Sequence, residues 1–230
     1  MKITSLFTAA VLVLPPIAMA DNILDSVIYS TGVDSNGNVV NGGSADSHFT
    51  TTGTNVTTGP AAVLSSGNLY PSWTPDNATG TLGSAWIGVD NGIGQPSTPY
   101  TFTESFNLTG YDATSVALAG TYWGDDIGYL AINGNVIGSF YGNNDGGLGW
   151  NPGYAFSVNG LSGDFVSGVN TITMTMTASD DYYDGVRLDI TTATADAVGA
   201  PDNASSLMLF GIGLAGLAGM AAARRRLVRA

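Results

Sequence analysis

Thr-Ile-Thr-Met-Thr-Met-Thr, at residues 171–177, is the stretch of sequence that decides the fold. Apolar side chains alternate with threonines along it, and this period of two is typical of a β-strand that buries one face. The same alternation recurs at 100–106, where aromatic residues alternate with Thr and Ser, and at 186–191. Several strands of this kind, with no helical period among them, predict an all-β domain built as an antiparallel two-sheet sandwich.

A turn signal joins two further strands between these stretches. Asn133-Gly134 separates the apolar runs 129–132 and 136–140, and Asn-Gly between two such runs is a strong hairpin signal. Toward the N-terminus the chain is rich in Gly, Asn, Ser and Thr, and strands are harder to place there. The segment 23–29 is the best candidate for a first strand.

The charge of the chain is strongly one-sided. Between residues 21 and 199 stand sixteen Asp and one Glu against a single Arg, and the whole chain carries a formal net charge of −12. An acidic surface of this kind repels nucleic acid and anionic lipid, so neither is expected as a partner. The chain has no Cys, so disulfides play no part in its stability.

The first twenty residues read as a secretory signal peptide. Lys2 gives the positive start, residues 6–14 are a short apolar run, and Ala18-Met19-Ala20 fits the small-x-small cleavage pattern. The mature chain is therefore expected to begin at Asp21, as an ectodomain spanning 21–199.

The C-terminal part, 200–230, has three pieces in a fixed order. Pro201-Asp202 comes first, and an uncharged run of nineteen residues, 205–223, follows it. As a helix this run covers roughly 28 Å, about the hydrocarbon thickness of a bilayer. The last piece is a basic cluster that the positive-inside rule keeps cytoplasmic, made of Arg224, Arg225, Arg226 and Arg229.

This order resembles the PEP-CTERM sorting signal of bacterial surface proteins, with Asp in place of the usual Glu and Asn203 in place of the second Pro. The resemblance implies an exosortase-type processing enzyme as a partner. It also implies a precursor held in the inner membrane by its tail, and a product at the cell surface or outside the cell.

The central part of the chain carries a second resemblance, which rests on an ordered series of short motifs. The series runs Asp46-Ser47-His48-Phe49, Ser84-Ala85-Trp86-Ile87, Gly120…Trp123…Asp126, Ile132-Asn133-Gly134, Gly168-Val169-Asn170-Thr171 and Gly185-Val186-Arg187-Leu188. It is similar to the β-sandwich domain common in PEP-CTERM proteins, which is itself similar to galactose-binding-like jelly rolls and carbohydrate-binding modules. The resemblance implies a jelly-roll fold and carbohydrate as the class of ligand.

Catalytic constellations are scarce in this sequence. His48 is the only histidine, no Cys is present and no Gly-x-Ser-x-Gly motif occurs. His48 precedes an aromatic residue at the start of a strand, which favours a structural role. The chain is therefore interpreted as non-enzymatic, although its many carboxylates leave an acidic glycosidase as an alternative.

Oxygen-rich loops make Ca²⁺ the candidate cofactor. None of them has the spacing of an EF-hand, and solvated turns are the alternative. The candidate ligands are the aspartates of two turns, Asp125 and Asp126 in one and Asp180, Asp181 and Asp184 in the other.

Aromatic residues set among Gly, Asn and Asp are candidates for sugar binding, because exposed rings stack on sugars. These are Tyr141, Trp150, Tyr182 and Tyr183. Trp86 and Trp123 are instead expected in the core. The sequence predicts a non-enzymatic surface or matrix protein associated with extracellular polysaccharide. A structural or adhesive coat protein without a sugar site is the alternative.

Overall fold

The computed structural model describes residues 24, 27–54, 56–76, 83–90, 99–141, 149–178 and 183–198. The predicted signal peptide and C-terminal tail lie outside these residues. The strands are β1 (Ala45–Gly53), β2 (Val56–Val63), β3 (Ile87–Gly88), β4 (Pro99–Asn107), β5 (Ala117–Asp125), β6 (Ile127–Ile132), β7 (Asn135–Phe140), β8 (Tyr154–Asn159), β9 (Val169–Thr177) and β10 (Gly185–Thr194). Three short 3₁₀ turns accompany them, η1 (Ser66–Asn68), η2 (Ala113–Ser115) and η4 (Gly160–Ser162).

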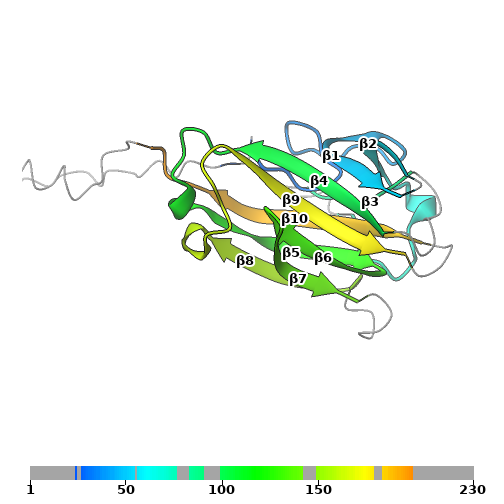
Figure 1. Ribbon diagram of the computed structural model, residues 1–230. Helices are drawn as coiled ribbons and strands as arrows, with labels where there is room; N and C mark the ends of the chain where they lie inside the picture. The colour runs from blue at the N-terminus through cyan, green and yellow to red at the C-terminus, as the bar shows by residue number, and fades with distance from the viewer. Residues whose placement is uncertain are drawn as a thin grey trace, which may run out of the picture.

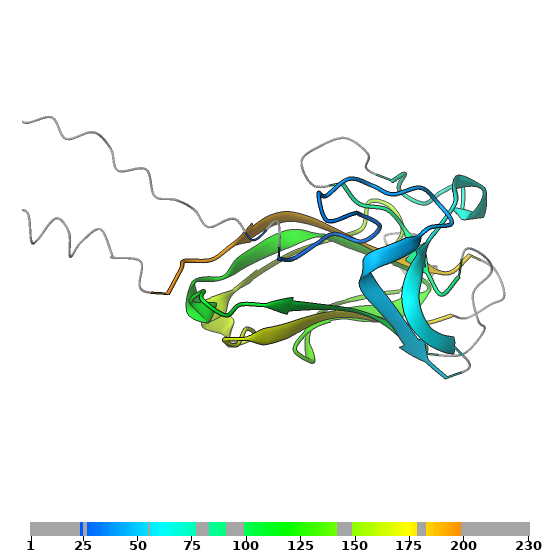
Figure 2. The same ribbon diagram turned by 90° about the horizontal axis from the view of Figure 1, so that it is seen from above.

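The ten strands form one antiparallel sheet in the order β7-β6-β9-β4-β1-β2-β3-β10-β5-β8. The sheet wraps around so that its two edge strands, β7 and β8, contact each other, which gives a shape close to a barrel (Figure 1). Seen from above, the β1–β2 hairpin crosses one end of the molecule (Figure 2). The predicted all-β antiparallel architecture is confirmed. The predicted division into two sheets is not found, because β2 pairs with β3 and the described strands form one sheet.

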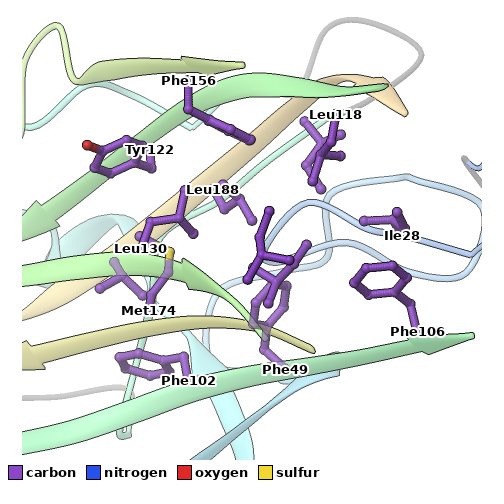
Figure 3. Close-up of a cluster of buried hydrophobic side chains, with 14 of the residues drawn as sticks. Ile28, Phe49, Phe102, Phe106, Leu118, Tyr122, Leu130, Phe156, Met174 and Leu188 are labelled. Atoms are coloured by element: carbon purple, nitrogen blue, oxygen red, sulfur yellow. The ribbon is translucent and has the colours of Figure 1, made fainter. Parts of the chain in front are cut away.

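The interior is filled by the apolar side chains that the alternation predicted. In the β4–β9 pair, Phe102 stands opposite Met174 and both are fully buried. Leu118 on β5 and Leu188 on β10 belong to the same buried cluster and line the interior from other strands (Figure 3). Burial of each large apolar side chain contributes roughly 1.5–3 kcal/mol, so this core is the main source of stability.

The Asn133-Gly134 hairpin is confirmed. Both residues have positive φ, 49° and 83°, as a type I′ turn requires, and Ile132 pairs with Asn135 across it. The Asn133 side chain also accepts a 2.8 Å hydrogen bond from the Thr171 backbone N–H. The turn is thus tied to the beginning of β9.

The expected strand at 23–29 is wrong for the residues that are described. The backbone N–H groups of Val27 and Ile28 donate to the Leu24 carbonyl and close a turn. The chain then runs beside β10, where the Thr31 hydroxyl accepts from the Leu188 N–H and the Ser30 hydroxyl accepts from the Ile190 N–H. Side-chain hydroxyls take the place of a strand's carbonyls here, which a hydrophobicity pattern cannot reveal.

Two buried carboxyl groups hold the same N-terminal segment. Glu104, on the inner face of β4, accepts a 2.8 Å hydrogen bond from the Tyr29 N–H. Asp46 accepts from the N–H groups of Gly32, His48 and Phe49 at 2.7–2.9 Å. Burial raises the pKa of both carboxyl groups, that of Glu104 well above its usual value, and the negative charge of Asp46 adds to the effect on Glu104.

Candidate functional site

The candidate site lies on the outer face of β5 and β10, toward the end of the barrel where β5 ends and β10 begins (Figure 1). The register pairs Trp123 with Arg187 and Asp125 with Gly185. Side chains on the outer face of a sheet are normally exposed to solvent. Three outward side chains here are instead at least nine-tenths buried, namely Trp123, Asp125 and Arg187. Other segments must therefore cover this face.

The cover is built from residues 64–76, 83–86 and 149–153. Trp73 stacks on Trp86 with 4.1 Å between ring centroids, and together with Leu64 and Trp123 they form a second hydrophobic cluster. The segments are joined by main-chain bonds, since the Thr74 N–H donates to the Trp150 carbonyl. The expected burial of Trp86 and Trp123 is confirmed, but they lie in this outer cluster and not inside the barrel.

Arg187 fastens the cover to the sheet. Its Nε donates to the Ser84 hydroxyl at 2.9 Å, and its Nη1 donates to the carbonyls of Thr74 and Pro75. The guanidinium carbon lies 4.6 Å from the Trp123 ring centroid, a cation–π contact. Burial lowers the pKa of Arg187, and the charges of Asp76 and Asp189 oppose that shift. Arg187 is thus a structural cation that holds the cover.

Three aromatic side chains gather on the surface of this cover. The ring centroid of Tyr70 lies 5.8 Å from that of Trp150 and 5.5 Å from that of Tyr183. Tyr183 in turn meets Trp73 edge-on at 6.3 Å. Tyr70 and Tyr183 are 38% and 37% exposed and Trp150 is half-buried. Tyr70, Trp150 and Tyr183 are called the aromatic patch below.

The structure therefore brings together two of the predicted sugar-binding residues, Trp150 and Tyr183. Tyr141 is exposed and follows β7, and among the described residues no ring contact links it to the aromatic patch. Tyr182 lies outside the described residues. Tyr70 was missed, although it stands in a turn beside Pro71 and Ser72 and meets the same criterion of an aromatic residue among turn formers.

Acidic residues lie near the patch, at the end of β5 and just before β10. Asp125, Asp126 and Asp184 are 6%, 4% and 3% exposed, and the Trp73 Nε1–H donates to Asp125 Oδ2 at 2.8 Å. The other two predicted ligands, Asp180 and Asp181, lie outside the described residues. Within the described part of the chain, no three His, Cys, Asp or Glu side chains form a group that could hold a metal by themselves.

His48 lies apart from this site. Its ring stacks on Tyr29 at 3.6 Å between centroids, which agrees with the structural role expected for it. Among the described residues, its Nε2 has no hydrogen-bond partner, so neither a Ser nor a carboxylate side chain is bonded to it.

Comparisons with family models, with curated proteins and with solved structures gave no match. Of the described residues, no helix has the length and hydropathy needed to cross a membrane. The candidate site thus rests on its own geometry.

Proposed function

We propose that this chain is an exported, non-enzymatic surface or matrix protein that holds extracellular polysaccharide on the aromatic patch. The observation that carries the proposal is the meeting of Tyr70, Trp150 and Tyr183, which come from three separate segments, beside the stacked Trp73–Trp86 pair. Single exposed aromatics are common on protein surfaces, whereas a tyrosine that contacts two further aromatic rings beside a buried tryptophan pair is not explained by chance exposure.

The physical basis is the stacking of a sugar's apolar C–H face on an aromatic ring. Tyr and Trp combine a large apolar face with a polar edge. Their side chains have few rotatable bonds, so little conformational entropy is lost when a ligand orders them. Contact between Trp73 and Tyr183 limits the movement of the patch. Ser72 and Asn151, both exposed, stand beside it and can hydrogen-bond sugar hydroxyls.

The charge of the chain favours a neutral or cationic glycan. The buried Arg187 is the only Lys or Arg between residues 3 and 223. A polyanionic glycan would meet repulsion from the acidic surface, which added salt would weaken. A neutral polysaccharide avoids that repulsion.

The near-barrel is proposed to be a jelly roll of the galactose-binding-like kind, and the ends of the chain are proposed to direct it to the surface. Residues 1–20 would be removed on export. The tail 200–230 would hold the precursor in the inner membrane until an exosortase-type enzyme acts near Pro201-Asp202. The support is the sequence order of these features.

Retention on immobilised polysaccharides tests the proposal. The purified chain is applied to a panel of neutral, cationic and acidic glycans at low and high salt. We expect retention on at least one neutral or cationic glycan, and weak retention on acidic ones that salt improves. A chain that passes unretained through the whole panel would contradict the proposed function.

An exposed aliphatic set at the opposite end of the barrel favours one rival. Around η4 and the beginning of β9, Leu161, Val166 and Val169 are 84%, 49% and 67% exposed, and Val198, near η2, is 67% exposed. A coat protein could use these side chains to contact other copies. Failure on the glycan panel, with concentration-dependent assembly that Leu161→Ser abolishes, would favour this rival.

A further inference from the structure

We propose that, while the tail is attached, the end of the barrel that carries η2 and η4 docks on the surface of a neutral phospholipid bilayer. This end is called the η2–η4 end below. The inference rests on the proposed membrane-held precursor and adds the face of the domain that meets the lipid. It is supported by exposed aliphatic side chains at this end and by the short connection from Val198 to the apolar run 205–223.

The loop 108–116, which contains η2, joins the segments that carry these aliphatic side chains. Leu161 follows Gly160, Val169 follows Gly168, and Val198 is the last described residue. Three main-chain hydrogen bonds of 2.7–2.8 Å connect the loop to these places, from Gly160 N–H to the Val116 carbonyl, from Leu108 N–H to the Gly168 carbonyl and from Val198 N–H to the Gly110 carbonyl. Figure 2 shows η2, η4 and the end of the described chain at the same end of the barrel.

The aliphatic side chains at this end are largely in water. Leu161, Val169 and Val198 are each at least two-thirds exposed, and Val166 is about half exposed. Val166 is held beside the start of β9, since its N–H donates to the Asn170 side chain at 2.8 Å. Single exposed aliphatic residues are common, but several at one end of a barrel indicate an interaction surface. Contact with lipid would remove their apolar area from water.

The length of chain beyond Val198 indicates which surface this end meets. Residues 199–204 separate Val198 from the apolar run 205–223, and even a fully extended connection of this length spans at most about 25 Å. β10 is ten residues long, so its two ends lie about 30 Å apart. When 205–223 lies in the bilayer, the connection holds the η2–η4 end close to the lipid surface. The aromatic patch lies toward the other end of β10 and can face outward.

The tether and the aliphatic contact act together. A few aliphatic side chains bind lipid weakly, since even one myristoyl chain gives only marginal, reversible membrane binding. A short tether raises the effective concentration of the η2–η4 end at the bilayer surface, so that a weak contact forms. Removal of the tail would therefore also release the barrel from the lipid.

The charges at this end indicate that the lipid is neutral. Asp112 and Asp196 are exposed beside η2, and Asp164 is half-buried beside η4. Arg187, the only Lys or Arg among the described residues, is fastened under the cover near the other end of β10. Anionic lipid would therefore be repelled, whereas a zwitterionic phospholipid carries no net charge.

Single-cysteine labelling of the full-length chain tests the docking, because the chain has no Cys of its own. Leu161→Cys, labelled with a polarity-sensitive fluorophore, is reconstituted into phosphatidylcholine vesicles at a low protein-to-lipid ratio. Ile127→Cys is the matched control, since Ile127 is exposed and pairs with Thr177 at the far end of β9 from Val169. Both positions are exposed, so neither change should disturb the fold.

The label at residue 161 should emit at shorter wavelength than the label at residue 127. Spin-labelled lipid should quench it several-fold more strongly, and Val169→Cys should behave as Leu161→Cys does. Part of the phosphatidylcholine is then replaced with phosphatidylglycerol, which should weaken the quenching at low salt and less so at high salt. Undiminished quenching at low salt would overturn the preference for neutral lipid.

Flotation of the same vesicles measures separately whether the tail holds the chain in the membrane. If the chain floats but lipid quenches the labels at residues 161 and 127 equally, the docking is overturned and the membrane-held precursor stands. If the label at residue 161 shifts in wavelength without quenching by lipid, another protein copy covers the η2–η4 end, which also overturns the docking. A chain that does not float overturns the membrane-held precursor and the docking with it.

Discussion

The Trp73 indole donates a 2.8 Å hydrogen bond from Nε1 to Oδ2 of Asp125. This bond connects the two parts of the candidate site, because Trp73 supports the aromatic patch through Tyr183 and Asp125 belongs to the acidic end of β5. Both side chains are more than nine-tenths buried. The bond is therefore shielded from water and should contribute more than an exposed one.

Trp73→Phe should destabilise the chain by about 2–4 kcal/mol. The change removes the hydrogen bond to Asp125 Oδ2, and it also leaves a space beside Trp86. Denaturant unfolding measures the loss. Trp150→Phe, at a half-buried position of the same cover, is the control and should cost less than half as much. Equal losses would mean that the Trp73–Asp125 bond has no special role.

Arg187→Met should destabilise by about 3–5 kcal/mol. Met fills a similar volume, but it leaves the Thr74 and Pro75 carbonyls without their donor and the nearby Asp76 carboxylate without its cation. Arg187→Lys should recover only part of the loss, since an ammonium group cannot reproduce the planar fork of donors. If Arg187→Met unfolds at the wild-type denaturant concentration, the cover is not fastened in this way.

Glu104→Gln should raise stability at neutral and alkaline pH. The pKa of Glu104 is higher in the folded chain than in the unfolded chain, because burial penalises its charged form. Stability from the neutral carboxyl group is therefore fully present below the unfolded pKa and is lost as pH rises through the folded pKa. Gln keeps an oxygen for the Tyr29 N–H and cannot ionise, so this loss should disappear.

The matched control is Asp112→Asn. Hydrogen bonds from Thr114 lower the pKa of Asp112, so its contribution is lost as pH falls and not as pH rises. Denaturant unfolding across a pH series should therefore show opposite slopes for the two variants relative to wild type. A wild-type decline in stability at alkaline pH that survives in Glu104→Gln would assign it to another group.

The sequence predicted most of the strands from Tyr100 onward and little before it. The alternation of apolar and polar residues predicts which face of β4 or β9 is buried, since successive side chains along a strand point to opposite faces of the sheet. The same rule places Glu104 inside, between Phe102 and Phe106, but a charged residue in that position is easily read as exposed. The N-terminal segment follows β10 through the hydroxyls of Ser30 and Thr31, which leave no periodic signal.

The candidate site was predicted in part, for a similar reason. Trp150 and Tyr183 stand among turn-forming residues, and that context indicates exposure. Their meeting through Tyr70 depends on long-range contacts that no local pattern records. Asp125 and Asp126 were identified as a pair, but their burial follows from the cover over β5, which is held by Arg187.

Processing of the two ends gives a separate prediction. The mature protein should begin at Asp21 and end near Pro201-Asp202, because a small-x-small site precedes the first position and the three-part tail follows the second. Intact mass of the surface-released protein measures both ends. A main product that still carries Arg224 to Arg229 would contradict processing of the tail.

The central claim is that the aromatic patch holds the glycan, and calorimetric titration of variants with the retained polysaccharide tests it most directly. Tyr70→Ala and Tyr183→Ala should each weaken affinity about tenfold, which corresponds to about 1.4 kcal/mol. Tyr129→Ala is the matched control, since Tyr129 on β6 is 38% exposed, as is Tyr70, and lies outside the patch. It should bind as wild type does. Wild-type affinity in all three variants would contradict the claim. The same loss of affinity in all three, including Tyr129→Ala, would also contradict it.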